Sequence, residues 1–257
     1  MLKEDCPNNN QKIYNSFYSQ HSWDKRDSLA ARYILYLLKK LLCNFDVSQI
    51  KSIVDVGCGD GSKTYNLIKI FPNAKIKGVD FSKEGINYAS RLYGRGGGED
   101  PEQVTFEYCD INSSYYLTTP YDLLVSFYVL EHIQVWESVI DYWVQSNIKY
   151  IIIFVPIGKM YKNDLREHFR HFKKYEIKEY MLASGYKLLN AFYWGFPFYY
   201  PITKIAIELQ RGTIHNTMAK KPSFFLKRVY DIMYFFYTKC CSKKIGGDFI
   251  GFFEKIS

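Results

Sequence analysis

The chain has 257 residues, of which 47% are hydrophobic and 18% aromatic, so it can bury a sizeable core and is not expected to be disordered. No apolar run is long enough to cross a bilayer, and the first residues lack the apolar centre of a signal peptide. Six scattered cysteines without a C-x-x-C pair argue against a zinc site or a disulfide framework, and they favour a reduced, cytoplasmic protein.

The net charge of +8 is distributed unevenly along the chain. Residues 201–257 contain ten Lys and Arg against four Asp and Glu, which leaves the preceding residues close to neutral. Basic surface attracts nucleic acid, anionic lipid or phosphorylated substrates, and charge alone does not choose among them.

Short apolar runs alternate with segments of helical spacing along most of the chain. Strands are expected at residues 53–56, 75–80, 104–108, 121–127, 150–155 and 248–254. Helices are expected at residues 23–43, 62–70, 82–92 and 136–147. This alternation predicts an α/β fold, in which helices cover both faces of a parallel sheet within a single domain over residues 1–257.

A glycine-rich turn over residues 55–61 follows the first strand and precedes a helix. Glycine lets the backbone turn tightly, and the helix start behind it presents free N–H groups to a carboxylate or phosphate. Asp80 ends the next strand 21 residues after Gly59, where an acid can accept both hydroxyls of a ribose. Asp110 lies just beyond the third strand and can accept the exocyclic amine of an adenine.

Two nucleoside cofactors could use such a turn. The dinucleotide fingerprint requires glycine at positions 57, 59 and 62, but position 62 is Ser62 and the third glycine is Gly61. The spacing D-x-G-x-G-x-G instead matches the motif of enzymes that use S-adenosylmethionine. A nicotinamide dehydrogenase is therefore the more distant alternative.

The chain resembles the class I S-adenosylmethionine-dependent methyltransferases, in particular their small-molecule and glycan-cluster branch. The resemblance rests on the glycine turn, on the ribose motif at 78–82 and on the fourth-strand motif at 121–133. It covers residues 50–193, the cofactor-binding core, and the last strand at 247–257. It implies a Rossmann-like, doubly wound sheet of seven strands whose last strand runs antiparallel.

The resemblance implies S-adenosylmethionine as the cofactor and gives roles to particular residues. The expected cofactor-binding residues are Asp55, Gly57, Gly59, Gly61, Asp80, Phe81, Asp110, Ile111 and Phe127. The glycines would line the methionine end of the cofactor, and Asp80 would bind its ribose. Phe81 would flank the adenine, while Asp110 and Ile111 would read its edge. Phe127 would lie near the sulfonium.

Methyl transfer from a sulfonium depends mainly on alignment, but a hydroxyl acceptor also needs a base. Glu131 and His132 are candidates because they follow the fourth strand, where parallel-sheet proteins bind ligands. His168 and His171 follow the fifth strand, three residues apart, and would share one face if this segment is helical. His168 is preferred because it fits the H-x-R-x-F stretch of glycan-cluster methyltransferases, which precedes a helix expected here at 174–184.

A metal ion is not expected in this site. In the related quinone O-methyltransferases, an E-x-x-E-H pattern after the fourth strand holds a divalent metal. Here Tyr128 stands at the first position, before Glu131 and His132, so the pattern is incomplete. The alternative for Glu131 and His132 is that they only cap and position a loop.

Three segments outside the core have their own expectations. Residues 1–45 would form a helical lid over the cofactor, as in many relatives, or would simply pack on the sheet. Residues 195–246 form an aromatic and basic insertion before the last strand, and the rings gathered at 192–200 could stack on a sugar or cover an apolar acceptor. Residues 222–240 have the pattern of a basic amphipathic helix, which can lie on an anionic membrane or belong to the core.

The sequence thus predicts a methyltransferase that acts on a hydroxyl of a sugar, glycan or nucleotide-sugar precursor, with a peripheral membrane contact through 222–240. One alternative is an apolar aromatic, quinone-like or natural-product acceptor. Another is a non-catalytic partner protein that binds S-adenosylmethionine. Nucleic acid is disfavoured, because the charge lies in one terminal region and no Asn/Asp-Pro-Pro-Tyr motif follows the fourth strand.

Overall fold

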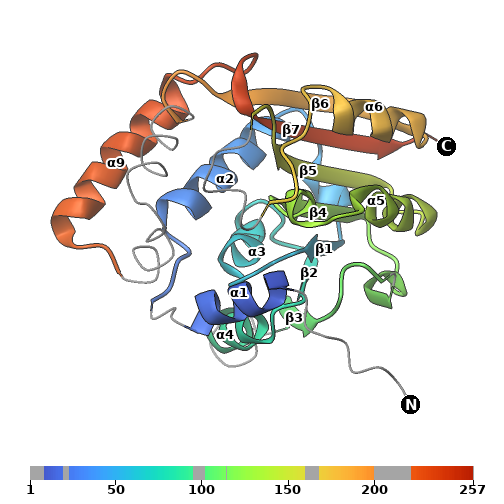
Figure 1. Cartoon of the computed structure of the whole chain (residues 1–257), viewed down its shortest axis with the longest axis horizontal. Coiled ribbons are helices and arrows are strands. Elements are labelled where there is room, and N and C mark those ends of the chain that lie inside the picture. The colour runs from blue at the N-terminus through green and yellow to red at the C-terminus, as the bar shows by residue number, and fades with distance from the viewer. Residues whose placement is uncertain are drawn as a thin grey trace.

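Seven strands form one mixed sheet with helices packed against it (Figure 1). The computed structural model describes residues 9–19, 23–94, 102–113, 115–159, 168–199 and 221–256. The strands are β1 Ser52–Val56, β2 Lys75–Asp80, β3 Val104–Tyr108, β4 Leu123–Phe127, β5 Tyr150–Pro156, β6 Tyr186–Gly195 and β7 Gly246–Lys255. The α-helices are α1 Asn9–Ser19, α2 Leu29–Leu41, α3 Ser62–Asn66, α4 Lys83–Tyr93, α5 Trp136–Gln145, α6 Glu176–Ala183 and α9 Phe224–Lys239. Short 3₁₀ turns include η2 Leu67–Lys69 and η4 Leu130–His132.

The strand order β3-β2-β1-β4-β5-β7-β6 places β1 and β4 side by side in the sheet. The first five strands pair in parallel, and β7 lies antiparallel between β5 and β6. The expected Rossmann-like, seven-stranded sheet with an antiparallel last strand is therefore confirmed. The chain winds outward from β1 through β2 and outward from β4 through β5. The sheet thus has a switch point between β1 and β4, where open parallel sheets bind ligands at the carboxyl ends of their strands.

The sheet is buried on both faces, as its nearly continuous apolar strands require. β5 is buried at every position, which is typical of a central parallel strand. On one face, Leu37 of α2 and Tyr237 of α9 join a core cluster with Phe154 of β5. On the other face, Trp143 of α5 and Met181 of α6 join a second core cluster.

The sequence marks where the main helices begin. The side chains of Ser28 and Ser82 accept hydrogen bonds from the backbone N–H groups of Ala31 and Gly85, which caps α2 and α4. The helix expected at 23–43 therefore begins only at Leu29. The helix expected at 62–70 is also shorter, because α3 ends at residue 66 and η2 continues it as a tighter turn.

Strand β6 is the element that the sequence pattern does not predict. Its last residues fall in the aromatic run that we expect to face an acceptor, but Phe192 and Trp194 are only 4% and 2% exposed. Both rings belong to the core cluster that contains α2, so the expectation of an acceptor-facing role is wrong for them. The physical reason is the pairing with β7, which turns alternate side chains of β6 toward the core.

The insertion expected at 195–246 is described only in part, since residues 200–220 lie outside the described residues. Its described part contains α9, which packs beside α2 on one side of the molecule (Figure 1). Among the helices described, none combines the length and the apolar composition needed to span a membrane.

We expect Trp194→Ala to lower the free energy of unfolding by about 3–5 kcal/mol, because the substitution empties a buried ring site. Leu189→Ala on the same strand is the matched control, since Leu189 is 39% exposed, and it should cost less than about 1 kcal/mol. Urea unfolding followed by circular dichroism measures both. Equal small losses would mean that Trp194 is not a core residue.

Candidate functional site

The glycine turn after β1 has the backbone conformation that the sequence predicts. Gly57, Gly59 and Gly61 have φ angles of +78°, +56° and +74°, which glycine adopts at little cost. A Cβ placed on Gly57 would lie 2.3 Å from Val129, and one on Gly61 would lie 2.6 Å from the Ala89 side chain. A larger residue at either position would therefore strain the backbone. It would also clash with Val129 in the loop after β4 or with Ala89 of α4.

Asp80 lies at the end of β2 and is hydrogen-bonded to the glycine turn. It is buried, with one carboxylate oxygen accepting the backbone N–H of Gly59 at 2.9 Å and the other accepting that of Ser82 at 2.8 Å. Burial raises the pKa of Asp80 to about 6, although the two N–H groups lower it. Each carboxylate oxygen keeps lone pairs that could accept a further hydroxyl.

The other cofactor residues expected from the sequence differ in their exposure to solvent. Asp110 is exposed, and its carboxylate accepts two hydrogen bonds from Asn112, while the adjacent Ile111 is buried in the core. Phe127 is buried edge-on against Phe154.

Asp55 lies fully buried in β1 and accepts the Thr64 hydroxyl at 2.6 Å. Burial raises the pKa of Asp55 to about 7. This carboxylate thus ties the strand before the glycine turn to the helix that follows it, and a direct contact with the cofactor stays a prediction.

Helix α1 lies across the same edge of the sheet. The Gln11 amide donates to the backbone carbonyl of Phe81 at 2.8 Å and to the Tyr108 hydroxyl at 3.1 Å. Asn15 accepts the hydroxyl of Ser82 at 2.7 Å. These bonds join α1 to the residues that follow β2 and to the end of β3.

Two tyrosines of α1 reach further into the site. Tyr18 lies so close to Gly59 that a Cβ placed there would come within 2.3 Å of its hydroxyl. The Tyr14 ring stands 5.9 Å from Phe81 and 5.5 Å from His132, and its hydroxyl lies 3.2 Å from a ring nitrogen of His132. Tyr14 therefore bridges the expected adenine region and the expected catalytic residues. This position supports the lid hypothesis for α1, which stays a prediction.

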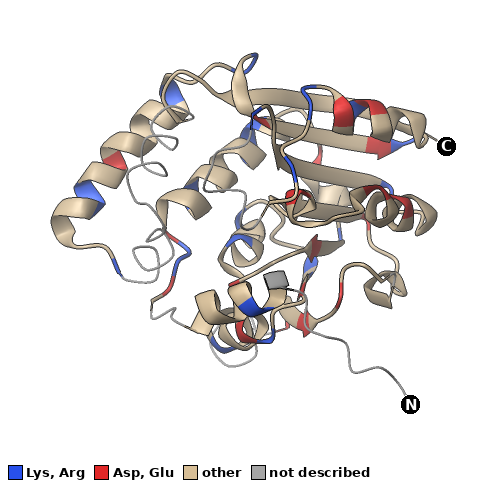
Figure 2. Cartoon of the chain, in the orientation of Figure 1, with Lys and Arg blue, Asp and Glu red and all other residues tan. Residues whose placement is uncertain are grey.

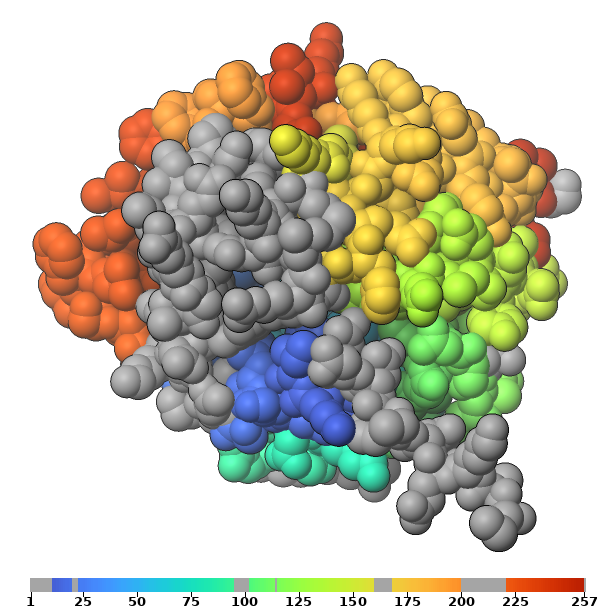
Figure 3. Space-filling model, in the orientation of Figure 1, coloured from blue at the N-terminus to red at the C-terminus, as the bar shows by residue number. Residues whose placement is uncertain are grey.

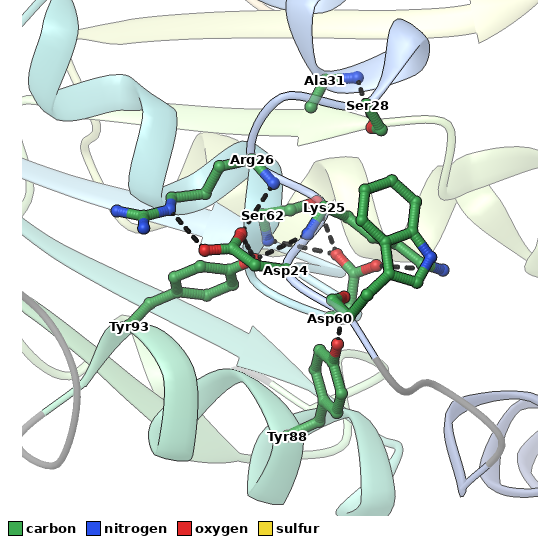
Figure 4. A network of polar contacts seen from close by, with 10 residues as sticks. Asp24, Lys25, Arg26, Ser28, Ala31, Asp60, Ser62, Tyr88 and Tyr93 are labelled. Atoms are coloured by element: carbon green, nitrogen blue, oxygen red, sulfur yellow. Dashed lines mark hydrogen bonds and ion pairs between the residues drawn. The ribbon is translucent and has the colours of Figure 1, made fainter. Parts of the chain in front are cut away.

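The segment after α1 is fastened to the glycine turn by a polar network (Figure 4). Lys25 pairs with Asp60 at 3.7 Å, and burial lowers the pKa of Lys25 to about 8. The Tyr93 hydroxyl donates to Asp24 at 2.7 Å, and that of Tyr88 donates to the carbonyl of Trp23. The network fixes the path by which the N-terminal segment approaches the site.

The four expected catalytic residues come together although they lie on two separate segments. The rings of His132 and His168 stand 4.5 Å apart, and Nδ1 of His168 lies 3.2 Å from Nε2 of His171. Glu131 is buried, and its carboxylate lies 3.9 Å from His132 Nε2. The backbone N–H of Phe169 donates to the Glu131 carbonyl at 2.8 Å, which holds the two segments together.

The same cluster contains a set of metal-ligating groups that the sequence motif does not reveal. One ligand atom each from Glu131, His132 and His168 lies within 4.8 Å of the others. His168 thus adds a third donor to the incomplete E-x-x-E-H pattern. The expectation that the site holds no metal is untested.

A second polar group at this edge was not expected from the sequence. Asp248 of β7 is buried beside Tyr128, which follows β4, and Tyr33 of α2 belongs to the same group. The Asp248 carboxyl and the Tyr128 hydroxyl face each other, and within the described part of the chain the Tyr33 hydroxyl has no hydrogen-bond partner. Tyr128 also has a φ of +60°, a conformation that is strained for a bulky residue and common at functional sites. The only feature of the sequence that pointed to this group is Asp248 itself, an acid at the start of an apolar strand.

Burial raises the pKa of Asp248 to about 7, although the facing Tyr128 hydroxyl lowers it. The carboxyl group therefore changes charge near neutral pH. Buried polar atoms are normally satisfied by protein, water or ligand, so this group is suited to receive a polar ligand atom.

Comparison with known proteins identifies the family. Residues 48–180, just over half of the chain, match the family described as "Methyltransferase domain". The chain belongs to this family and is a class I S-adenosylmethionine-dependent methyltransferase, with S-adenosylmethionine as its cofactor. The observed site fits that cofactor, because the glycine turn offers close backbone approach and the buried Asp80 offers acceptors for ribose hydroxyls.

Two curated relatives match parts of the chain. Malonyl-acyl-carrier-protein O-methyltransferase of Bacillus cytotoxicus is 25% identical over 172 residues, which are 66% of this chain and 57% of that protein. A protein of Invertebrate iridescent virus 6 is 27% identical over 92 residues, which are 36% of this chain and 31% of that protein. Both matches span less than two thirds of the relative's length.

Solved structures share the fold at low sequence identity. The 4+2 cyclase SpnF superposes with a TM-score of 0.58 at 16% identity, over 88% of this chain and 82% of that one. The O-methyltransferase from a trans-AT polyketide multienzyme of Brevibacillus brevis, in complex with S-adenosyl-L-homocysteine, superposes with a TM-score of 0.54 at 13% identity, over 86% of this chain and 72% of that one. At these identities the likeness establishes the fold alone.

We expect Asp80→Asn to weaken binding of S-adenosylhomocysteine by about 10- to 100-fold near pH 8, since hydrogen bonds to a charged group contribute about 1.5–3 kcal/mol. Wild-type affinity should fall as the pH drops through about 6, where Asp80 gains a proton, and the variant should lack this change. Calorimetric titration at several pH values tests both points. Glu179→Gln on the exposed face of α6 is the control, and equal affinities for all three proteins would remove Asp80 from the cofactor site.

Asp248 gives a second pH-dependent prediction. A carboxyl group whose pKa is raised in the folded state binds its proton more tightly there, so the free energy of unfolding should fall as the pH rises from 5 to 8. For a pKa of about 7, this group contributes about 2.5 kcal/mol of that fall. Urea unfolding at both ends of the range should show a fall that is smaller by this amount in Asp248→Asn and unchanged in Glu179→Gln. An unchanged fall in Asp248→Asn would contradict the burial of an ionisable carboxyl group.

Proposed function

We propose that the protein transfers the methyl group of S-adenosylmethionine to a hydroxyl of a sugar, glycan or nucleotide-sugar precursor. The observation that carries the proposal is the cluster of Glu131, His132, His168 and His171 near the cofactor residues. Tyr14 links the two, since it contacts both Phe81 and His132. A hydroxyl acceptor needs a base at this place, and imidazole changes its protonation near neutral pH.

The bound cofactor supplies an electrophilic methyl group on a positively charged sulfur. In the proposed step, His168 accepts the proton of the acceptor hydroxyl while the new O–CH₃ bond forms and the S–CH₃ bond breaks. His171, 3.2 Å away, can hold the His168 ring in place through the other ring nitrogen. Glu131 would stabilise positive charge in the cluster from its buried position beside His132.

The name of one curated relative supports an oxygen acceptor, because the protein of Bacillus cytotoxicus is an O-methyltransferase by name. The preference for a sugar or glycan rests on the H-x-R-x-F resemblance around His168. We also propose a reducing, cytoplasmic location, supported by the free thiols of the five cysteines among the described residues.

A specific observation favours a second candidate, an aromatic or quinone-like acceptor. Tyr33 stacks on Tyr199 with ring centroids 4.6 Å apart, beside Tyr128 and Asp248. An aromatic hydroxyl could pack on these rings and donate its proton to Asp248. In that reaction Asp248, rather than His168, would be the base.

The proposal is tested in two stages. Calorimetry with S-adenosylmethionine, its demethylated product and NAD should show binding of the first two, and binding of NAD alone would overturn the family's cofactor for this chain. A screen with methyl-labelled cofactor then compares nucleotide sugars, glycans, phenols and quinols, each with EDTA or added Mg²⁺. Labelling of a sugar hydroxyl supports the proposal, and labelling only of phenols or quinols supports the second candidate. Activity that EDTA abolishes would make Glu131, His132 and His168 a metal site.

Once an acceptor is known, His168→Ala should lower kcat by about 10²- to 10⁴-fold, which is the usual contribution of a general base. Affinity for S-adenosylhomocysteine should stay within about twofold, because the loss of a base that acts on the acceptor lowers kcat without weakening cofactor binding. Asp248→Asn is the comparison that separates the two bases. Normal turnover by His168→Ala would remove this residue from the mechanism.

A further inference from the structure

Helix α9 carries a row of large apolar side chains on its outer surface. Phe224, Phe225, Ile232 and Phe235 are 77%, 78%, 60% and 55% exposed. Their spacing places them on one face of the helix, with the half-exposed Phe236 at its margin. Single exposed apolar residues are ordinary on a protein surface, but a contiguous group of this size marks an interaction site.

Positive charge is mixed into this apolar face. Arg228 lies four residues after Phe224 and four before Ile232, and Lys239 lies four after Phe235, so both share the face. Residues 221–244 contain six Lys and Arg and one acid, Asp231. That acid is paired with Arg32 of α2 at 2.6 Å, so basic side chains outnumber unpaired acids on this helix (Figure 2).

The opposite face of α9 anchors the helix to the body of the protein. Tyr234 and Tyr237 make ring contacts with Tyr36 and Tyr33 of α2, and the Tyr36 hydroxyl donates to the Thr238 carbonyl. The helix is therefore fixed with its apolar face turned outward, at the left edge of the molecule in Figures 1 and 3.

We propose that the outer face of α9 docks the protein on the surface of an anionic phospholipid bilayer. Aromatic rings enter the headgroup boundary, while Arg and Lys on the same face meet lipid phosphates and other anionic groups. A second copy of the chain fits less well, because docking two such faces would bring cations together, and charged residues are depleted from protein–protein interface cores. The single helix lies on the bilayer, in keeping with the lack of any spanning helix among those described.

Docking would also orient the candidate site. Tyr237, on the inner face of α9, contacts both Tyr33 and Tyr199, which border the buried Asp248. The docked helix would thus lie between the bilayer and this polar group. A lipid-linked acceptor could then approach the polar group from the bilayer. This consequence rests on the second candidate function, in which Asp248 is the base, whereas docking itself does not.

The test is co-sedimentation of the full chain with vesicles of phosphatidylcholine alone or with about one quarter phosphatidylglycerol. We expect at least tenfold stronger binding to the anionic vesicles and a loss of that advantage at high salt, because salt screens the cations. Phe225→Glu and Phe235→Glu should each weaken binding at least tenfold. Tyr115→Glu, at another ring that is 68% exposed, is the matched control and should bind like the wild type. Phe225→Ser is a milder variant in case a glutamate disturbs folding.

Binding of S-adenosylhomocysteine by each variant reports separately on the cofactor site, so failure of the proposed function and failure of docking can be told apart. Equal binding to both vesicle types, or equal binding by the α9 variants and the Tyr115 control, would overturn the proposal. A dimer in light scattering that Phe225→Glu dissociates, without vesicle binding by the wild type, would show that a second copy covers this face instead.

Discussion

The carboxylate of Asp80 is the constraint on which the rest of the site depends. Its two oxygens accept N–H groups from Gly59 in one loop and Ser82 in the next, so a single buried charge holds two strand ends in register. The tight turn is possible only because Gly57 and Gly59 adopt positive φ angles. The same oxygens keep free lone pairs, and for this reason we predict that Asp80 also binds the ribose hydroxyls of the cofactor.

Helix α1 links this clamp to the candidate catalytic residues. Tyr18 packs on Gly59, and Tyr14 contacts both Phe81 and His132, so one helix contacts the expected cofactor residues and the candidate catalytic residues. An ion pair between Lys25 and Asp60 fastens the chain that follows. A movement of α1 would therefore change contacts in both halves of the site, because both sets of contacts are made by this one helix.

The two faces of helix α9 have different surroundings, since one is packed in the core and the other is exposed. Its inner tyrosines complete the core above α2 and border the group around Asp248, where a raised pKa reflects the cost of burying charge. Its outer phenylalanines are exposed and share their face with Arg228 and Lys239. The fold thus places a buried polar group and an exposed apolar surface on either side of one helix.

The sequence by itself determined the glycine turn, Asp80, the parallel strands and the antiparallel last strand, and through them the cofactor. These features follow from short-range spacing and resemblance, because a turn and its helix cap need only neighbouring residues. The tertiary structure alone decided that β6 joins the sheet edge and buries Trp194, and that Tyr33, Tyr128 and Asp248 meet in the core. It also placed the ring of His168 against that of His132. Such contacts join residues far apart in the chain, and only strand order and packing bring them together.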